Sequence, residues 1–391
     1  MQQATGIVAE YNPLHNGHLY HLAATKKAAG LPVIIIMSGS MVQRGEPALL
    51  DKWTRARLAV RYGADLVFEL PTAFTLRSAQ YFASGAVKLL QACGCVTTLS
   101  CGAEHPQYDF LSLATAISST GFQQALHSLI GQGLSYAAAA EAALQSLKMT
   151  PAALKTPNDI LALEYCRALL GSKMRPLFIQ RQGADYNDTQ INSQLPSATA
   201  IRAAFYEGRT ETIADTVPAE VYENICRTGH DRLKLLWPLI SYQLRMLTPR
   251  QIAGRCQCSE GLENLLKSAS SCSDLTEALR CCSTSRYPAS RIRRLFLQLL
   301  LNRPVTYWQQ REPAYLRLLA FNNTGRMLLK SIKSHGQLPV ITKLGRRPLQ
   351  GQNTAFQQQL ELDIAAADLL SLLDTKPAGS DYLTSPYYDR N

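Results

Sequence analysis

GIVAEYNPLHNGHLYH, residues 6–21, joins a short apolar run to an Asn-Pro turn and to two histidines that flank an Asn-Gly pair. The run 5–9 suits a buried strand, and Asn16 can cap the helix that follows. His15 and His18 are therefore predicted to lie at the corner where a strand turns into a helix. Because the first N–H groups of a helix are unpaired and favour negative charge, we expect this corner to bind phosphate.

Strands and helices are predicted to alternate over the first hundred residues. The apolar strand runs are short and uninterrupted, which is typical of a parallel sheet covered by helices on both faces. The predicted fold class is therefore α/β, with a doubly wound parallel sheet, and ligands of such sheets bind at the carboxyl ends of the strands. The predicted strands are 5–9, 33–37, 66–69 and 96–101, and the predicted helices are 17–29, 51–62 and 78–92.

The pattern changes after this region. Residues 108–171 are predicted to be helical, a further strand ends at Arg181, and another helix follows in LPSATAIRAAFYEG, residues 195–208. Beyond about residue 216, only amphipathic helical segments are expected. The predicted domains are an α/β domain over residues 1–212 and a mainly α-helical, basic domain over residues 213–391.

SATAIR, residues 197–202, is a second candidate for anion binding. Ser197 and Thr199 supply hydroxyls at the start of a helix, and Arg202 follows them. With backbone N–H groups, these side chains can surround one anion. Ordinary packing inside a helix is the alternative for the two histidines, but the pairing of both elements favours a site that stabilises charge at an attacked α-phosphate.

The net charge of +11 is concentrated in one region. Residues 281–350 contain thirteen Lys or Arg and one acid, so this segment alone carries +12 and the remainder is nearly neutral. Such a concentration indicates an acidic partner. The interleaved aromatic residues could stack on bases, but at helical spacing they more often belong to the core. They are Tyr287, Tyr307, Trp308 and Tyr315.

Membrane insertion and metal binding are not expected. The longest apolar run, LPVIIIM at residues 31–37, is far shorter than the roughly 20 residues of a membrane helix, and the N-terminus lacks a signal pattern. We therefore expect a cytoplasmic protein. The ten cysteines lack zinc-type doublets and are interpreted as free thiols. A metal site made by His15, His18 and His21 would lack an acid or cysteine to complete it. No protein partner is evident from the sequence.

Two motifs carry a family resemblance. GIVAEYNPLHNGH resembles the HxGH motif of the nucleotidyltransferase superfamily, although Asn12 stands where many members have Asp, and SATAIR resembles that superfamily's Ser-x-Thr-x-x-Arg phosphate motif. The chain more closely resembles the bacterial tRNA(Met) cytidine acetate ligase family. The stretches that carry this resemblance over most of the chain are VAEYNPLHNGHLYHL, MSGSMVQRGEPAL, YGADLVFELP, TPNDILALEY, IQRQGADYND, YPASRIRRLF and YLRLLAFNNTGRMLLKSI.

The resemblance implies an ATP-dependent ligase. Such an enzyme joins acetate to ATP as acetyl-adenylate and then passes the acetyl group to N4 of the wobble cytidine, position 34, of elongator tRNA(Met). The first predicted domain would be the nucleotide-binding catalytic domain, the second would bind tRNA, and Mg²⁺ is expected to accompany ATP. Two alternatives stay open: a small-molecule nucleotidyltransferase of the same superfamily, and a non-catalytic RNA-binding protein with a vestigial phosphate site.

The same resemblance assigns site residues. His15 and His18 would be the catalytic residues at the phosphates, Gly102 would let adenine or ribose approach the backbone, and Asn158 and Arg181 would contact ATP. Helix capping is the alternative for Asn158, and a surface charge is the alternative for Arg181. The residues expected to bind ATP are Ile7, Val8, Ala9, Glu10, Tyr11, Asn12, Pro13, Leu14, His15, Asn16, Gly17, His18, Leu19, Tyr20, Gly102, Asn158, Arg181, Ser197, Thr199 and Arg202.

The basic segment is predicted to contact RNA phosphates. A solvated helix face is the alternative, but the acidic partners expected at i, i+4 on such a face are almost absent. Arg291 and Arg294 share a helix face and Arg293 points elsewhere. No role is predicted for the polar loop 43–46. The residues expected to bind tRNA are Arg286, Arg291, Arg293, Arg294, Arg326, Lys330 and Lys333.

Overall fold

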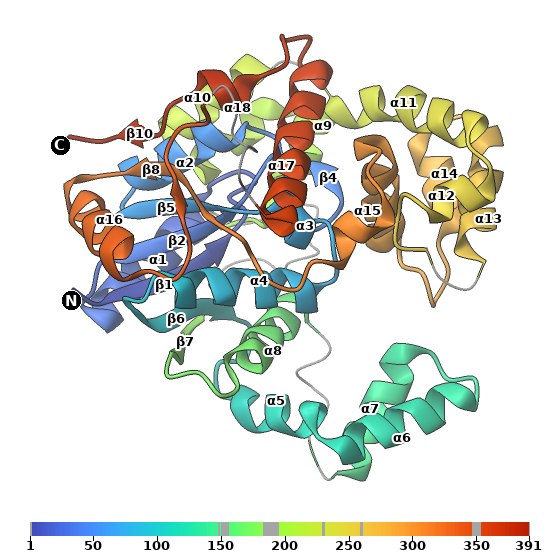
Figure 1. Ribbon diagram of the computed structural model, residues 1–391, viewed down its shortest axis with the longest axis horizontal. Helices are drawn as coiled ribbons and strands as arrows, with labels where there is room; N and C mark the ends of the chain where they lie inside the picture. Colours follow the sequence, from blue (N-terminus) through green and yellow to red (C-terminus); the bar gives the residue numbers. More distant parts are fainter. Residues whose placement is uncertain are drawn as a thin grey trace.

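A mainly parallel sheet runs through the middle of the protein, with helices on both of its faces (Figure 1). The computed structural model describes residues 2–147, 149, 156–182, 195–228, 231–258, 261–345 and 353–390. Within these residues the sheet has the strand order β10-β8-β5-β2-β1-β6-β7, and β9 also pairs with β8. Neighbouring strands are parallel except β5 and β8, which are antiparallel. The strands are β1 (Ala4–Ala9), β2 (Val33–Ser38), β5 (Leu66–Leu70), β6 (Val96–Ala103), β7 (Arg175–Gln180), β8 (Leu316–Phe321), β9 (Val340–Ile341) and β10 (Tyr387–Tyr388), and a separate hairpin is formed by β3 (Met41–Val42) and β4 (Glu46–Pro47).

The central strand β2 shows why its sequence is an unbroken apolar run. Ile34 and Ile36 join the apolar cluster on one face of the sheet, and Ile35 and Met37 join the cluster on the other. Both faces are covered, so neither set of side chains can be polar. The predicted α/β fold class is confirmed, and the five predicted strands agree with β1, β2, β5, β6 and β7 to within a few residues.

The helices form two layers and two extensions. Helices α1, α2, α9 and α10 pack on one face of the sheet, and α4, α8 and α17 pack on the other. Helices α11–α15 form a lobe beside the carboxyl edge of the parallel strands, and α5–α7 project from below it (Figure 1). The α-helices are α1 (Asn16–Ala29), α2 (Lys52–Arg61), α3 (Thr72–Thr75), α4 (Ala79–Ala92), α5 (Phe110–Ser118), α6 (Thr120–Gly131), α7 (Tyr136–Ser146), α8 (Pro157–Leu169), α9 (Ala198–Tyr206), α10 (Ala219–Thr228), α11 (Arg232–Met246), α12 (Pro249–Ala253), α13 (Leu262–Ser268), α14 (Leu275–Cys282), α15 (Ala289–Leu301), α16 (Asn323–His335), α17 (Thr354–Leu373) and α18 (Ser380–Leu383), and 3₁₀ turns span Thr210–Thr216, Ala269–Ser271 and Val305–Gln309.

The expectation that only helices follow residue 216 is wrong. Strands β8, β9 and β10 come from this part of the chain and extend the sheet of the first part. The predicted boundary between residues 212 and 213 therefore does not separate a sheet from a helical domain. Strand β8 escaped prediction because Arg317 interrupts its short apolar run, yet Arg317 is buried and donates to the backbone oxygen of Asp381 over 3.1 Å.

A buried ion-pair network connects the end of the chain to the sheet. The Lys52 Nζ atom on α2 lies 2.8 Å from Glu69 Oε2 on β5 and 2.8 Å from Asp381 Oδ1 on α18. Each of these side chains is only 1% exposed. A buried charge is costly unless it is paired, so the segment around α18 is required to neutralise Lys52 together with Glu69.

No described helix is long and apolar enough to cross a membrane. All ten cysteines are free, and seven of them are buried. Burial raises the pKa of Cys95 to about 11 and that of Cys166 to about 12. These thiols therefore stay protonated at neutral pH and behave as small apolar side chains.

Candidate active site

The two histidines of the HNGH sequence form the N-terminal cap of α1. His15, in an extended conformation, is the N-cap, and its Nδ1 accepts a hydrogen bond of 3.1 Å from the Gly17 N–H. His18 Nδ1 accepts in turn from the His15 N–H at 3.3 Å. The prediction that Asn16 caps the helix is wrong, because the Asn16 amide instead donates to the Asp215 carbonyl. His15 thus replaces the usual short polar cap.

These hydrogen bonds define the protonation of both rings. Burial, followed by the charges of Arg181 and Arg202, lowers the pKa of His15 to about 3. Burial and the neighbouring His15 and Arg181 lower the pKa of His18 well below its usual range. Both imidazoles are therefore neutral at pH 7. A hydrogen bond to the Pro13 backbone opposes the shift for His18. Because each Nδ1 accepts a backbone N–H, these bonds favour the tautomer with the proton on Nε2, from which a ring can donate to a bound oxygen.

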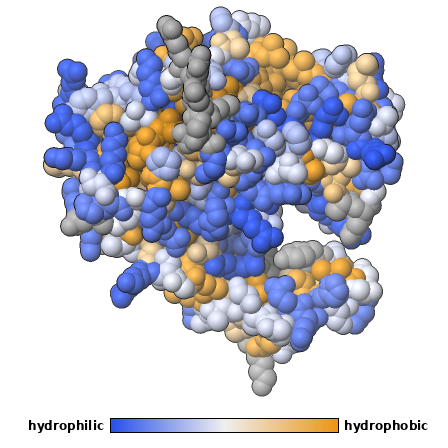
Figure 2. All heavy atoms as spheres, in the orientation of Figure 1, coloured by the Kyte–Doolittle hydropathy of each residue, from blue (hydrophilic) through white to orange (hydrophobic). Residues whose placement is uncertain are grey.

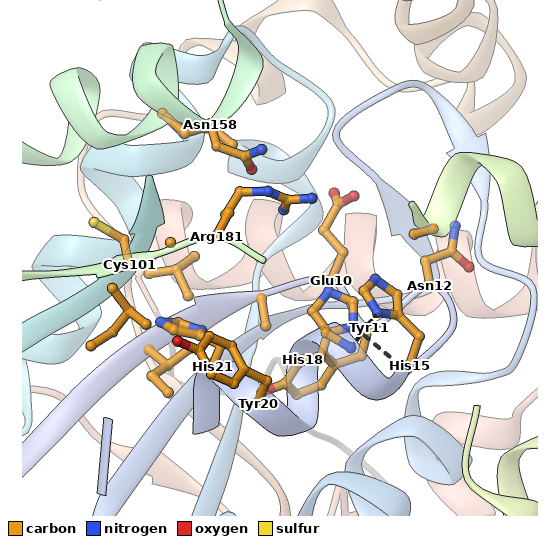
Figure 3. A pocket seen from close by; sticks show the side chains of 18 of the residues that line it. Glu10, Tyr11, Asn12, His15, His18, Tyr20, His21, Cys101, Asn158 and Arg181 are labelled. Carbon is orange, nitrogen blue, oxygen red and sulfur yellow. Dashed lines mark hydrogen bonds between the residues drawn. The ribbon is translucent and has the colours of Figure 1, made fainter. Parts of the chain in front are cut away.

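A pocket at the carboxyl ends of β1, β6 and β7 contains most of the predicted nucleotide-binding residues (Figure 3). It lies at the position where ligands of open α/β sheets bind. Predicted residues that line the pocket are Ile7, Val8, Ala9, Glu10, Tyr11, Asn12, His15, Gly17, His18, Tyr20, Gly102, Asn158, Arg181, Thr199 and Arg202. Those not among its lining residues are Pro13, Leu14, Asn16, Leu19 and Ser197.

Several of these outlying residues have structural roles. Leu14 is buried in an apolar cluster, and Leu19 packs against the same cluster. The hydroxyl of Ser197 caps α9 by accepting the Ala200 N–H at 3.0 Å. Direct contact of these three side chains with ATP remains a prediction, but their positions favour support of the loop and of the helix.

Helix α9 brings the second anion-binding element to the same pocket. Arg202 is 7% exposed, and its Nη1 donates to the carbonyl oxygens of Asn12 at 2.8 Å and Ala198 at 3.0 Å. Asn12 in turn accepts the Leu49 N–H through Oδ1 at 2.7 Å. The two motifs, almost two hundred residues apart in the sequence, are thus joined directly, and the pairing predicted for them is confirmed as a spatial one.

Asn158 and Arg181 lie on the opposite side of the pocket from the histidines (Figure 3). Asn158 does not cap α8, because Thr156 occupies the N-cap position, and its Nδ2 donates to Glu104 Oε1. Arg181 Nε lies 3.8 Å from the same carboxylate. The apolar side chains of Leu161, Tyr165 and Ile179 line this end together with Gly102. This combination suits an aromatic base with polar edges.

Glu10 is the only acid among the described lining residues. Its Oε1 accepts the Gln43 N–H at 2.6 Å. Burial raises the pKa of this carboxyl, and the Gln43 hydrogen bond and the charges of Arg202 and Arg55 oppose that shift. Glu10 therefore combines the proton affinity of a buried carboxyl with a fixed orientation.

Sequence reasoning missed some lining residues. His21 faces the pocket and contacts Ser100 Oγ through Nε2 at 3.1 Å; its spacing of three residues from His18 was a signal for a shared face. Gln43 and Arg44 reach the pocket from the β3–β4 hairpin. Glu104, which does not line the pocket itself, accepts a hydrogen bond from Asn158 and follows directly after β6, where the sheet topology places ligand-binding residues.

The structure divides the predicted tRNA-binding residues into two groups. Helix α15 packs beside the β3–β4 hairpin, where Arg293 pairs with Glu46 and Arg294 donates to the Gln43 carbonyl. Helix α16 lies at the opposite edge of the sheet, since the Asn322 N–H before it donates to Asp65 and the Gln337 N–H after it donates to Ala92. That helix carries Arg326, Lys330 and Lys333.

Other features of the basic segment belong to the interior. Trp308 and Tyr315 are fully buried, and Tyr287 is 9% exposed, so these rings are core residues. Burial and the charge of Arg291 lower the pKa of Arg294 to about 10. Arg346 and Arg347, and residues 183–188 of the IQRQGADYND stretch, lie outside the described residues.

The fold and the site together define a nucleotidyl transferase. The model of the family described as HIGH Nucleotidyl Transferase matches residues 1–383, and the chain belongs to this family. Curated relatives named tRNA(Met) cytidine acetate ligase include proteins from Clostridium perfringens, 34% identical, and Alkaliphilus metalliredigens, 36% identical; each comparison covers 98% of both chains. Within the wider family, the chain is a member of the tRNA(Met) cytidine acetate ligase family.

Solved structures agree with this assignment. The apo structure of Thermotoga maritima TmcAL has a TM-score of 0.93 to this chain at 31% sequence identity, with 100% of both chains covered. A second structure of that protein, bound with alpha-thio ATP, has a TM-score of 0.90 at 30% identity over the same coverage. The similarity therefore includes the helical lobe as well as the sheet.

Proposed function

We propose that this protein is an ATP-dependent ligase that acetylates N4 of cytidine 34 in elongator tRNA(Met), with acetyl-adenylate as the intermediate. The observation that carries the proposal is the direct joining of the HNGH corner and the SATAIR helix around one pocket. The printed name of the relatives and the ATP analogue in the T. maritima structure support the substrate assignment. The site of this reaction would be the cytoplasm, where tRNA is modified.

The two parts of ATP would occupy different ends of the pocket. The triphosphate would lie against His15, His18, Thr199 and Arg202, where two helix N-termini also point. Adenine and ribose would occupy the end at Gly102 and Asn158. A carboxylate cannot donate a hydrogen bond, so Glu104 fixes Asn158 with Nδ2 towards itself and leaves Oδ1 as an acceptor for the nucleotide.

Adenylation requires placement and charge neutralisation more than a protein nucleophile. An acetate oxygen attacks the α-phosphorus of ATP, an acyl phosphate bond forms, and pyrophosphate leaves. Neutral His15 and His18 donate hydrogen bonds to the phosphate oxygens that gain charge, and the Arg202 guanidinium stabilises the triphosphate. Mg²⁺ would supply further charge neutralisation and would be bound mainly by the phosphates, since Glu10 is the only acid in the described lining.

Acetyl transfer requires a proton acceptor. The N4 amine of cytidine attacks the carbonyl carbon of acetyl-adenylate, AMP leaves, and one amine proton must be removed. Glu10 has the raised pKa and the position in the pocket that suit this role. We therefore assign Glu10 as the general base of the second step.

The tRNA would approach from the carboxyl edge of the sheet. Figure 2 shows a notch on this side, between the α11–α15 lobe and the α5–α7 extension, with hydrophilic side chains along its border. Arg286, just before α15, and Arg291, in its first turn, would contact RNA phosphates there. Arg326, Lys330 and Lys333 on α16 could contact the same RNA only if it also reached the opposite edge of the sheet. The assignment of these three residues to tRNA binding therefore has less support.

Pyrophosphate release from ATP tests the catalytic part of the proposal. The purified protein should release pyrophosphate only when acetate is present and should accumulate acetyl-adenylate without tRNA. Release that requires a phosphorylated small molecule in place of acetate would favour the alternative nucleotidyltransferase. Absence of release under all conditions would favour a non-catalytic RNA-binding protein.

A further inference from the structure

The β3–β4 hairpin lies between helix α15 and the pocket. Gly45 forms its turn with a φ of 80°, and an added Cβ atom would lie 2.5 Å from the Arg294 backbone nitrogen. Only glycine therefore permits this close approach of the hairpin to α15. The side chains of Gln43, Arg44 and Glu46, which have no role in the reaction described above, flank this contact.

Glu46 bridges two arginines of different elements. Its Oε1 accepts a hydrogen bond of 2.8 Å from Arg293 Nη1 on α15, and its Oε2 lies 3.4 Å from Arg202 Nε on α9. Glu46 and Arg202 are both 7% exposed. The carboxylate thus connects the helical lobe to the guanidinium that faces the triphosphate.

A second connection runs parallel to the first. Arg294 Nη1 donates to the Gln43 carbonyl at 3.0 Å, and the Gln43 N–H donates to Glu10 in the pocket. Consecutive residues of α15 thus hold the hairpin on both sides of Gly45. In a buried setting, each of these charged hydrogen bonds restricts the side chain that it reaches.

A buried guanidinium requires an opposite charge to keep its orientation. Arg202 has two backbone carbonyls and Glu46 as partners. Arg293 binds the other oxygen of Glu46, so the two guanidinium groups share this one carboxylate. The Arg202 Nη2 atom takes no part in these three contacts and would donate to the phosphate of a bound ATP.

We propose that Glu46 is a positioning residue for Arg202 in ATP binding, and that Arg293 on α15 holds Glu46 in place. This inference rests on the proposed binding of ATP in the pocket. It changes the assignment of Arg293, which would serve the nucleotide site and not the RNA. It also makes α15 a part of adenylation, even in the absence of tRNA.

Acetate-dependent ATP–pyrophosphate exchange without tRNA tests this inference. For Glu46→Gln and Arg293→Gln we expect the KM for ATP to rise about tenfold, with a smaller change in kcat. Glu46→Asp and Arg293→Lys keep the charges and should recover part of the loss. Arg303→Gln is the matched control, because Arg303 has a similar exposure, 37% against 31%, and pairs with Glu361 away from the pocket.

The outcomes separate the inference from the proposed function. If the parent protein shows no acetate-dependent exchange, the proposed function fails. If the parent is active and both Gln variants keep its KM for ATP, the positioning role is wrong. If the KM for ATP rose equally in Arg303→Gln and Arg293→Gln, the positioning role would also be wrong, and the change would be a general effect on stability. Arg293 is partly exposed, so its variant is expected to fold even if Glu46→Gln does not.

Discussion

The rings of His15 and His18 lie against each other at the start of α1, with their centroids 3.7 Å apart and their planes tilted by 30°. Each ring accepts a backbone N–H through Nδ1, so the helix cap and the proposed catalytic donors are the same two side chains. Because of this dual use, we expect that a residue able only to cap the helix would not replace either ring. The same hydrogen bonds favour the tautomer with the proton on Nε2 before a nucleotide binds.

The first prediction concerns His18. His18→Ala should lower the rate of acetate-dependent pyrophosphate release about 10²- to 10³-fold, because one donor to the developing phosphate charge is lost. His18→Asn should restore the acceptor for the His15 N–H, and with it the stability, without restoring the rate. A folded His18→Ala protein with the parent rate would contradict the role of this ring.

The second prediction uses the lowered pKa values. Burial, reinforced by the charge of Arg181, lowers the pKa of His15 to about 3 and that of His21 to about 4, from 6.5 in the unfolded chain. Between pH 6.5 and 4 the unfolded chain binds more protons than the folded protein. As the pH is lowered through this range, the free energy of unfolding should therefore decrease by roughly 1.4 kcal/mol per pH unit for each histidine. Denaturant unfolding at several pH values measures this dependence. In His15→Asn, the free energy of unfolding should depend less steeply on pH, because the contribution of one histidine is lost. An unchanged pH dependence would mean that His15 is not held neutral.

The third prediction separates the two chemical steps. Glu10→Gln keeps an oxygen that can accept the Gln43 N–H but removes the base. We expect acetyl-adenylate formation to continue and acetyl transfer to tRNA to fall by about 10²-fold or more. Rapid-quench measurement of both products tests this difference. Equal loss of both steps would assign Glu10 to ATP binding, for instance through Mg²⁺.

The fourth prediction concerns the ion-pair network around Lys52. Lys52→Met leaves Glu69 and Asp381 buried without their cation, so the free energy of unfolding should fall by about 3–5 kcal/mol. Arg227→Met removes an exposed pair with Glu223 and should cost less than about 1 kcal/mol. Similar losses of free energy of unfolding in the two variants would mean that the buried ion pairs of Lys52 with Glu69 and Asp381 do not hold the segment around α18 in place.

The same network determines how the protein can be divided. Truncation after about residue 215 would be expected, from the sequence alone, to leave a catalytic domain able to adenylate. Because β8, β9 and β10 complete the sheet and Asp381 pairs with Lys52, we instead expect the truncated chain not to fold. Point variants are therefore required to separate tRNA binding from adenylation.

The fifth prediction tests the RNA surface. Changing Arg286 and Arg291 to Ala should weaken tRNA binding and reduce the log–log salt slope by roughly 0.7 to 0.9 for each lost phosphate contact. Changing the three basic residues of α16 should have a much smaller effect, because that helix lies at the opposite edge of the sheet. Titration of each variant with tRNA over a series of salt concentrations measures the affinity and the salt slope. A larger effect from α16 would move the RNA site to that edge.

Local patterns in the sequence predicted five strands of the sheet and the two motifs that meet at the pocket, but not β8, β9 or β10. The strands β1, β2 and β5 are encoded in short apolar runs, and the HNGH corner lies within one turn of a helix. What sequence could not provide are pairings between distant residues. The partner of Arg317 comes from residue 381, and the partner of Arg293 comes from residue 46.

Charge counting had the same weakness. The basic segment has almost no acid of its own, which favoured a free RNA-binding surface. In the structure, Arg293 and Arg303 are paired with Glu46 and Glu361, both outside that segment, and Arg317 is buried. A local excess of charge therefore overestimates the number of cations that are available to RNA.

Nucleoside analysis of tRNA tests the central claim most directly. The purified protein should be incubated with ATP, acetate labelled with ¹⁴C and elongator tRNA(Met) transcribed without modifications. The account predicts labelled N4-acetylcytidine at position 34, with one AMP and one pyrophosphate formed for each acetyl group transferred. Pyrophosphate release without labelled N4-acetylcytidine, or label at another nucleoside, would contradict it.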